Sequence, residues 1–210
     1  MKAGLAVLFL SLVSAIAVVP AFADPALYSN GSSTYNNGDS PNIGFEVTDS
    51  FTLPSNSVVT GVTFDVWLSS EDTLSTVDWS IGTSQYGGTP VTAGTTGTFI
   101  KTNGDEFDVY SESFSIPSLA FGPGTYWLTL QNAVTVSGDD ANGDDAFWDE
   151  SNGPSLASRN IVGNVRSIPS ETFQILGTQG TTVTPEPSSF LLLGSGLAAL
   201  AGLLKRKLKA

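Results

Sequence analysis

The stretch VVTGVTFDVWL, residues 58–68, decides the fold class of this chain. Apolar side chains occupy its even-numbered positions apart from Thr60, and Thr63 and Asp65 stand between them. Successive side chains of a β-strand point to opposite faces of a sheet, so this alternation predicts a strand with one buried face.

The same alternation recurs along the chain, in stretches bounded by Gly, Pro, Asn and Asp. Further strands are predicted over Gly44–Leu53, Val77–Ile81, Thr98–Lys101, Thr125–Leu130 and Glu171–Leu176. Inside the domain that contains these strands, no stretch shows the apolar period of a helix over three turns. We therefore predict an all-β domain, an antiparallel β-sandwich of the jelly-roll type.

One stretch, residues 107–116, does not keep a single phase. Its apolar positions change from Phe107 and Val109 to Tyr110, Phe114 and Ile116. This change predicts either a β-bulge or two separate strands.

The first 23 residues have the features of a secretory signal peptide. Lys2 gives the positive start, an apolar stretch follows, and Ala21-Phe22-Ala23 is a small-x-small cleavage site. Cleavage by signal peptidase would leave a mature chain that begins at Asp24. We expect residues 24–176 to form one ectodomain, residues 177–184 a linker, and residues 185–210 a separate C-terminal segment.

The C-terminal segment predicts a short membrane helix. Residues 190–204 form 15 residues without a charge, about 22 Å as a helix against a bilayer core of about 30 Å. The basic residues Lys205, Arg206 and Lys207 follow the run and should stay on the cytoplasmic side, which leaves the ectodomain outside.

Pro185-Glu186-Pro187, the apolar run and the basic tail follow one another in an order that resembles the PEP-CTERM sorting signal. The resemblance implies recognition by an exosortase, a membrane transpeptidase that cleaves near the motif and releases or transfers the domain. It also implies a bacterium with an extracellular polysaccharide matrix, and it assigns no activity to the β-rich ectodomain. An ordinary short tail anchor is the alternative.

Composition excludes several kinds of site. The whole chain has a net charge of −12, and residues 24–184 hold three basic and 19 acidic residues, a net charge of −16. Such a surface argues against nucleic acid as a partner, because phosphates require Lys and Arg. The chain has neither Cys nor His, which excludes Ser-His-Asp and Cys-His catalysis and zinc sites with the usual His or Cys ligands.

The densest acidic stretch, residues 139–145, is a candidate calcium loop. Asp139, Asp140, Asn142, Asp144 and Asp145 offer the hard oxygen ligands that Ca²⁺ prefers, and a cation would relieve their mutual repulsion. The positions of its glycine and of Glu150 depart from a standard calcium loop. A solvated turn between two strands is the alternative to a structural Ca²⁺.

Three tryptophans are candidate platforms for carbohydrate. Trp67 and Trp127 lie on the polar phase of their strands, and Trp148 stands among acids beside the candidate calcium loop. Sugar rings stack on exposed aromatic faces, so these positions suit a polysaccharide ligand. Packing against a second layer or a covering loop is the other interpretation.

Together these patterns predict an exported, non-catalytic protein of the bacterial surface or extracellular matrix, embedded in or binding exopolysaccharide. Its partners would be signal peptidase, then the inner membrane and an exosortase. A secreted carbohydrate-active enzyme, similar to a glycoside hydrolase, is the alternative function. Such an enzyme needs two carboxylates at a set separation, and nothing in the sequence selects a pair from the 19 acids.

Overall fold

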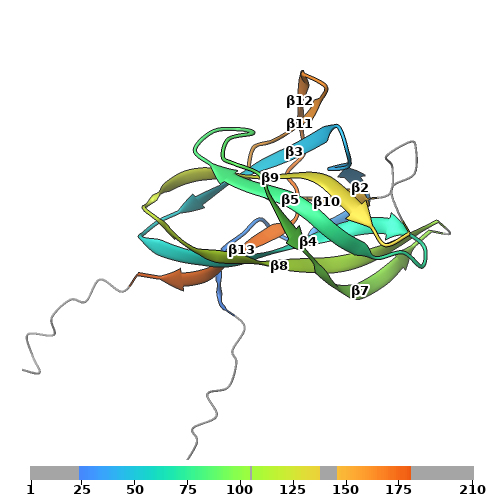
Figure 1. Cartoon of the computed structure of the whole chain (residues 1–210), viewed down its shortest axis with the longest axis horizontal. Helices are drawn as coiled ribbons and strands as arrows, with labels where there is room; N and C mark the ends of the chain where they lie inside the picture. Colours follow the sequence, from blue (N-terminus) through green and yellow to red (C-terminus); the bar gives the residue numbers. More distant parts are fainter. Residues whose placement is uncertain (1–23, 105, 138–145, 181–210) are drawn as a thin grey trace, which may run out of the picture.

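The computed structural model describes residues 24–104, 106–137 and 146–180, which form two stacked antiparallel sheets (Figure 1). The predicted antiparallel β-sandwich is confirmed. The chain changes sheet repeatedly, so strands that follow one another in sequence, such as β3, β4 and β5, belong to alternate layers.

Sheet A is built around the long strand β4. One side of β4 pairs with β8, and β8 pairs with the edge strand β7; the other side pairs with β13 and β10, which continue into β1 and β2. Its strands are β1 (Ala26–Ser29), β2 (Ser33–Asp39), β4 (Ser57–Ser69), β7 (Thr96–Asn103), β8 (Phe107–Phe121), β10 (Ala146–Ser151) and β13 (Phe173–Gln179).

Sheet B has the strand order β12-β11-β3-β9-β5-β6. The hairpin of β11 and β12 extends away from the body of the sandwich (Figure 1). Its strands are β3 (Phe45–Leu53), β5 (Leu74–Gly82), β6 (Val91–Gly94), β9 (Gly124–Thr135), β11 (Ala157–Ile161) and β12 (Asn164–Ile168).

The core lies between the two sheets and is filled by the alternate residues that the sequence pattern marks as apolar. On β4 these are Val62, Phe64, Val66 and Leu68, each at most 1% exposed. Burying one such side chain contributes about 1.5–3 kcal/mol to folding. Large aromatic side chains from both sheets complete the core: Phe51, Trp79, Phe114, Trp148 and Phe173.

Residues 107–116 form part of one continuous strand, β8, rather than two. The alternation changes because both faces of the strand are covered here. Val109 pairs with Trp67 on the outer face of sheet A and is nevertheless fully buried, whereas Phe114 points into the core. The pairing of β8 with β7 shifts register opposite this point, between Phe99 and Lys101, which face Tyr110 and Val109. A second register shift, between β4 and β8, lies further along, between Val59 and Gly61 of β4.

The ectodomain continues beyond the predicted boundary at Leu176, because β13 stays paired with β4 as far as Gln179. The predicted signal peptide and the predicted membrane helix lie outside the described residues. Within the residues that the structure describes, no helix has the length and apolarity needed to cross a membrane.

Candidate functional site

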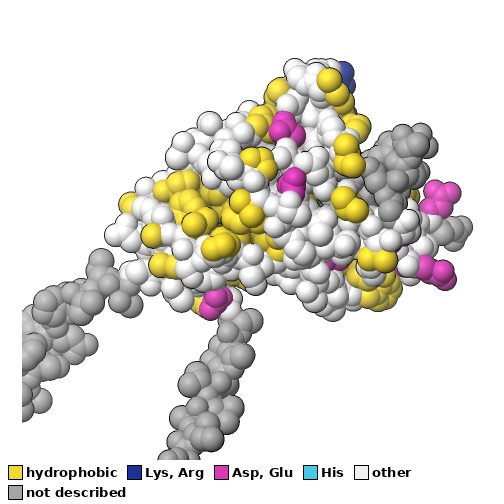
Figure 2. All heavy atoms as spheres, in the orientation of Figure 1, with side chains coloured by type: hydrophobic (Ala, Val, Ile, Leu, Met, Phe, Trp, Pro, Cys, Tyr) yellow, Lys and Arg dark blue, Asp and Glu magenta, His cyan; other side chains and the backbone are white. Residues whose placement is uncertain are grey.

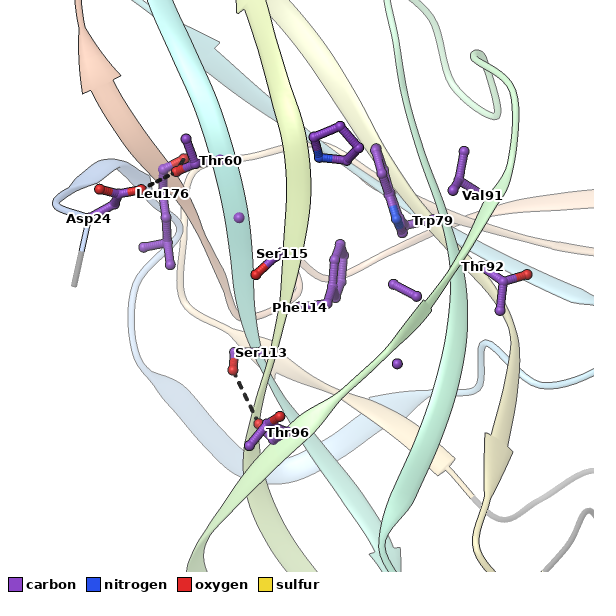
Figure 3. Close-up of a pocket in the computed structure, with 14 residues that line it drawn as sticks. Asp24, Thr60, Trp79, Val91, Thr92, Thr96, Ser113, Phe114, Ser115 and Leu176 are labelled. Atoms are coloured by element: carbon purple, nitrogen blue, oxygen red, sulfur yellow. Dashed lines mark hydrogen bonds between the residues drawn. The ribbon is translucent and has the colours of Figure 1, made fainter. Parts of the chain in front are cut away.

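A cleft of about 600 Å³ opens where β4 and β8 of sheet A approach β5 and β6 of sheet B (Figure 3). Hydroxyl groups are frequent along its walls, with apolar side chains beneath them. The hydroxyls belong to Thr60, Thr92, Thr96, Ser113 and Ser115.

Trp79 and Phe114 form the apolar floor of the cleft. Their ring centroids are 5.8 Å apart with the planes at 24°, and each residue is 5% exposed. Figure 3 shows the two side chains next to each other between the strands of the two sheets. The floor is therefore a fixed part of the core rather than a mobile surface group.

Of the described residues that line the cleft, one is charged: Asp24, at one end. Its carboxylate accepts a hydrogen bond from the Thr60 hydroxyl, and near the other end of the cleft Ser113 donates to the Thr96 carbonyl oxygen at 3.2 Å (Figure 3). On the face that Figure 2 presents, hydrophobic side chains gather into a patch, with acidic side chains scattered around it. The hydroxyl-rich walls of the cleft suit an uncharged ligand that is itself rich in hydroxyl groups.

A second, smaller hollow of about 190 Å³ surrounds Trp67 on the outer face of sheet A. Phe107 lies 6.2 Å from the Trp67 ring and 5.7 Å from Phe147, centroid to centroid. Gly38 completes the wall, and a Cβ at this position would lie 2.5 Å from the Trp148 carbonyl oxygen. Trp67 is partly exposed, as a stacking platform requires.

Trp127 is also partly exposed, but on the other sheet. It lies on β9, where Tyr126 and Leu128 point into the core. Trp67 and Trp127 therefore lie on opposite outer faces of the sandwich. No single face of the sandwich therefore carries both Trp67 and Trp127, because their strands belong to different layers.

Trp148 is not a surface platform, and that prediction is wrong. The side chain is 0% exposed and packs against Phe64 and Phe173 at centroid distances of 6.2 and 5.7 Å. Its indole Nε1–H donates to the Thr172 carbonyl oxygen at 2.7 Å. The acidic neighbours suggested exposure, but Asp149 points to the opposite face and is itself buried.

A buried polar network surrounds Asp49 in the interior of the sandwich, and it was not predicted from the sequence. Asp49 Oδ2 accepts hydrogen bonds from Asn30 Nδ2 at 3.0 Å and from the Glu171 backbone N–H at 2.7 Å. Burial raises the pKa of Asp49 to about 6. Asn30 directly follows β1, and Glu171 lies just before β13. These bonds therefore connect β3 of sheet B to two segments of sheet A.

The carboxyl oxygens of two further buried acids, Asp149 and Glu171, have no hydrogen-bond partner among the described residues. Burial raises the pKa of Asp149 to about 6, although the Trp67 indole N–H approaches its carboxylate without the geometry of a good hydrogen bond. Burial, with repulsion from Asp39 and Asp49, raises the pKa of Glu171 well above its ordinary value. Burial therefore favours the neutral form of the Glu171 carboxyl.

Glu112 is a third such acid and lies beside the cleft. It is 1% exposed, and Gly97 of β7 packs directly against its carboxyl oxygen, where a larger residue would collide. Burial raises the pKa of Glu112 to about 7. Its neighbours Ser113 and Thr96 line the cleft, but Glu112 itself does not.

Among the described residues no three acids converge closely enough to hold a metal ion. The candidate calcium loop at residues 139–145 lies outside the described residues, so the calcium prediction stays a prediction. The sorting residues Pro185, Glu186, Pro187, Lys205, Arg206 and Lys207 also lie outside them.

The cleft itself was not predicted, because its walls come from strands that are distant in sequence. One signal for it was available. Serines alternate in Ser111-Glu-Ser-Phe-Ser115, and such alternation indicates a row of hydroxyls along one face of a strand.

A family model, the PEP-CTERM protein-sorting motif, matches residues 183–207. The chain therefore carries this motif, which confirms the resemblance drawn from the sequence, and it is an exported protein that an exosortase recognises and processes. No curated protein is similar enough to the chain to count as a match.

Proposed function

We propose that the ectodomain is a non-catalytic component of the cell surface or extracellular matrix that binds polysaccharide. The observation that carries the proposal is the cleft of about 600 Å³, in which five hydroxyl side chains stand above the Trp79–Phe114 floor. Hydroxyl groups exchange hydrogen bonds with a sugar without the desolvation cost of a charge. The buried aromatic pair beneath them keeps the shape of the cleft fixed.

Charge narrows the class of polysaccharide. Residues 24–184 have a formal net charge of −16, and no basic side chain among the described residues lines the cleft. An acidic polymer would meet repulsion from this surface, whereas a neutral polymer would not. We therefore assign neutral polysaccharide as the ligand.

The acid content of the cleft supports a binding role over hydrolysis. Glycosidases place two carboxyl groups on either side of the bond that they cleave, about 5–10 Å apart. Within the part of the chain that the structure describes, Asp24 is the one carboxylate that lines the cleft. The buried acids Glu112 and Glu171 do not reach its surface.

The sorting signal supports the proposed location. Export followed by exosortase processing delivers the ectodomain beyond the inner membrane, where polysaccharide is available. Signal peptidase would remove residues 1–23 and the exosortase the tail that begins near Pro185. The processed domain would then lie at the cell surface or in the matrix.

Affinity electrophoresis tests this function. The processed protein should be retarded in native gels that contain a neutral polymer such as hydroxyethylcellulose or pullulan, and should migrate normally in alginate, which is acidic. Incubation with the same polymers should release no reducing ends. Release of reducing ends would favour the carbohydrate-active enzyme, and unchanged migration in every neutral polymer would contradict the proposal.

A Ser113→Trp substitution is designed to fill the cleft. Ser113 is partly exposed on β8, so a larger side chain can project outward without entering the core. The control is Thr125→Trp on β9 of the other sheet, an exposed position that does not line the cleft. The proposal requires that Ser113→Trp abolish retardation and that Thr125→Trp leave it unchanged.

A further inference from the structure

The Asn30 carboxamide lies inside the buried polar network around Asp49 and is 0% exposed. Its Nδ2 donates to Asp49 Oδ2 at 3.0 Å, to Ser155 Oγ at 2.6 Å and to the Glu171 carbonyl oxygen at 2.7 Å. Its Oδ1 accepts a hydrogen bond from the Tyr28 hydroxyl at 2.8 Å. A primary amide has two N–H groups, so the three acceptors around Nδ2 are one more than the Asn30 amide can satisfy.

The Ser155 hydroxyl lies beside the reactive carbon of this amide. Because an amide C–N bond is about 1.33 Å long, an oxygen 2.6 Å from Nδ2 lies at most about 3.9 Å from Asn30 Cγ. A rotation of the Ser155 side chain can bring Oγ to the separation of about 3–3.5 Å from which a nucleophile attacks. Ser155 precedes β11 of sheet B and stands 125 residues along the chain from Asn30, which follows β1 of sheet A.

Asp49 contacts both groups that exchange a proton in such an attack. Its Oδ2 is 3.0 Å from Asn30 Nδ2, and the Ser155 hydroxyl donates to the same carboxyl. Burial raises the pKa of Asp49 to about 6. A carboxyl with a pKa near the working pH can both accept and return a proton. The backbone N–H groups of Ser50 and Glu171 hold this carboxyl in place, at 2.6 and 2.7 Å.

The surroundings of the amide suit a reaction that excludes water. The Tyr28 hydroxyl already donates to Oδ1, the atom on which negative charge develops when the carbonyl carbon is attacked. Gly153 packs directly against the carboxamide, where a Cβ would collide with Asn30 Oδ1. This cover keeps water from the carbonyl carbon. Tyr28 and Ser155 are partly exposed, which leaves a way out for a small product.

We infer that Ser155 and Asn30 form an intramolecular ester that joins the two sheets covalently. Ser155 Oγ attacks Asn30 Cγ while Asp49 accepts the hydroxyl proton. Asp49 then returns this proton to Nδ2 as the C–N bond breaks, and ammonia leaves. One amide and one hydroxyl are consumed, and one ester and one ammonia are formed, without any change of oxidation state or any co-reactant. The escape of ammonia into dilute solution makes the step irreversible.

The ester would do for this domain what a disulfide does for others. The chain has no Cys, and a covalent bond between residues far apart in sequence restricts the unfolded chain most. The bond forms once, within one molecule, and does not depend on the ligand of the cleft. This modification therefore goes beyond the proposed function and is tested separately from it.

Tryptic digestion of the processed protein, isolated from its host and denatured, tests the ester. The basic residues of the ectodomain are Lys101, Arg159 and Arg166. Trypsin therefore separates residues 24–101, which contain Asn30, from residues 102–159, which contain Ser155. With the ester the two peptides should stay joined, at a mass lower than their sum by one ammonia, and mild alkali should separate them. Recovery of two separate, unmodified peptides would overturn the inference.

Two serine variants make the result specific. Ser155→Ala removes the nucleophile from a half-buried position, so it should give separate peptides and a lower melting temperature. Ser167→Ala, at an exposed position of β12, is the matched control and should keep the peptides joined. Peptides that stay joined in Ser155→Ala would contradict the assignment of Ser155 as the nucleophile.

The Asn30-Gly31 sequence supplies a competing reaction that the same digest recognises. The Gly31 backbone nitrogen could attack Asn30 Cγ, close a succinimide and also release ammonia. The peptide of residues 24–101 would then be lighter by one ammonia but separate from residues 102–159, and Ser155→Ala would not change it. This result would overturn the ester.

Discussion

Trp79 of β5 stacks on Phe114 of β8, with ring centroids 5.8 Å apart, and so connects the two sheets at the floor of the cleft. Phe114 also contacts Phe64 at a centroid distance of 6.1 Å. The same pair therefore stabilises the sandwich and shapes the candidate site. A substitution at this point should affect both properties.

Phe114→Ala should lower the free energy of unfolding by about 3–5 kcal/mol, because it leaves a cavity beneath the cleft. The control is Phe99→Ala on the edge strand β7, where the side chain is 53% exposed. This control should lower the free energy of unfolding by only about 0.5 kcal/mol. Equilibrium unfolding in urea measures both. Similar losses for the two variants would contradict the position of Phe114 in the core.

Glu112 should make stability depend on pH. Burial raises its pKa from 4.5 to about 7, so the folded protein binds the proton more tightly than the unfolded chain. The stabilisation by protonation is complete below about pH 4.5 and is lost as the pH rises through about 7. Glu112→Gln should therefore raise the free energy of unfolding at pH 8 by about 1–3 kcal/mol relative to its effect at pH 4.5.

The control for this prediction is Glu106→Gln, an exposed position that loses the same charge. It should shift the unfolding free energy by a similar small amount at both pH values. If Glu112→Gln has the same effect at pH 4.5 and pH 8, the Glu112 carboxyl is not held in the buried, neutral form.

The ion pair between Arg159 of β11 and Asp39 of β2 joins the two sheets and should contribute to the free energy of unfolding. Arg159 Nη1 lies 2.8 Å from Asp39 Oδ1, and the Asp39 side chain is 6% exposed. Arg159→Met should cost about 1–3 kcal/mol of stability, since it leaves a nearly buried carboxylate without its partner. Adding Asp39→Asn should recover part of that loss, and a double-mutant cycle with no coupling would contradict the prediction.

The candidate calcium loop predicts a response to chelation. If Asp140 and Asp144 hold Ca²⁺, EDTA should lower the melting temperature and added Ca²⁺ should restore it. The double substitution Asp140→Asn and Asp144→Asn should remove this response. An unchanged melting temperature in EDTA would identify the loop as a solvated turn.

The sorting motif predicts a processing defect. Glu186→Ala should leave the full-length precursor in the membrane, because the exosortase would no longer recognise its signal. Glu171→Ala is no control, since Glu171 is buried; Glu106→Ala is a suitable one, since Glu106 is exposed and distant from the tail in sequence. Immunoblots of membrane and extracellular fractions distinguish the precursor from the processed form.

Strands with one buried face were predictable from sequence. Residues 58–68 lie in the middle of sheet A, with one face toward sheet B, so their alternation is nearly strict. The alternation failed in residues 107–116, where the outer face is covered by Trp67 and Phe107 is packed against Phe147. A pattern of one residue type per face holds only where one face meets water.

The candidate site was predictable in part. Trp67 was singled out because it lies on the polar phase of its strand; the structure leaves it partly exposed, and its role as a platform stays a prediction. Trp148 was misassigned because its acidic neighbours were taken for a sign of exposure. Asp49, Glu112 and Glu171 were counted as surface charge, although each is at most 1% exposed. The cleft depends on which strands lie side by side across the two sheets, and alternation within one strand carries no information on that.

Intact mass spectrometry of the mature protein from its native host tests export and exosortase processing most directly. Export and exosortase processing predict a mass that runs from Asp24 to near Pro187, with any added mass showing what was attached. A mass that still includes Lys205 to Ala210 would identify a tail-anchored protein. It would contradict delivery of the ectodomain to the matrix by an exosortase, and the proposed location in the matrix would be wrong.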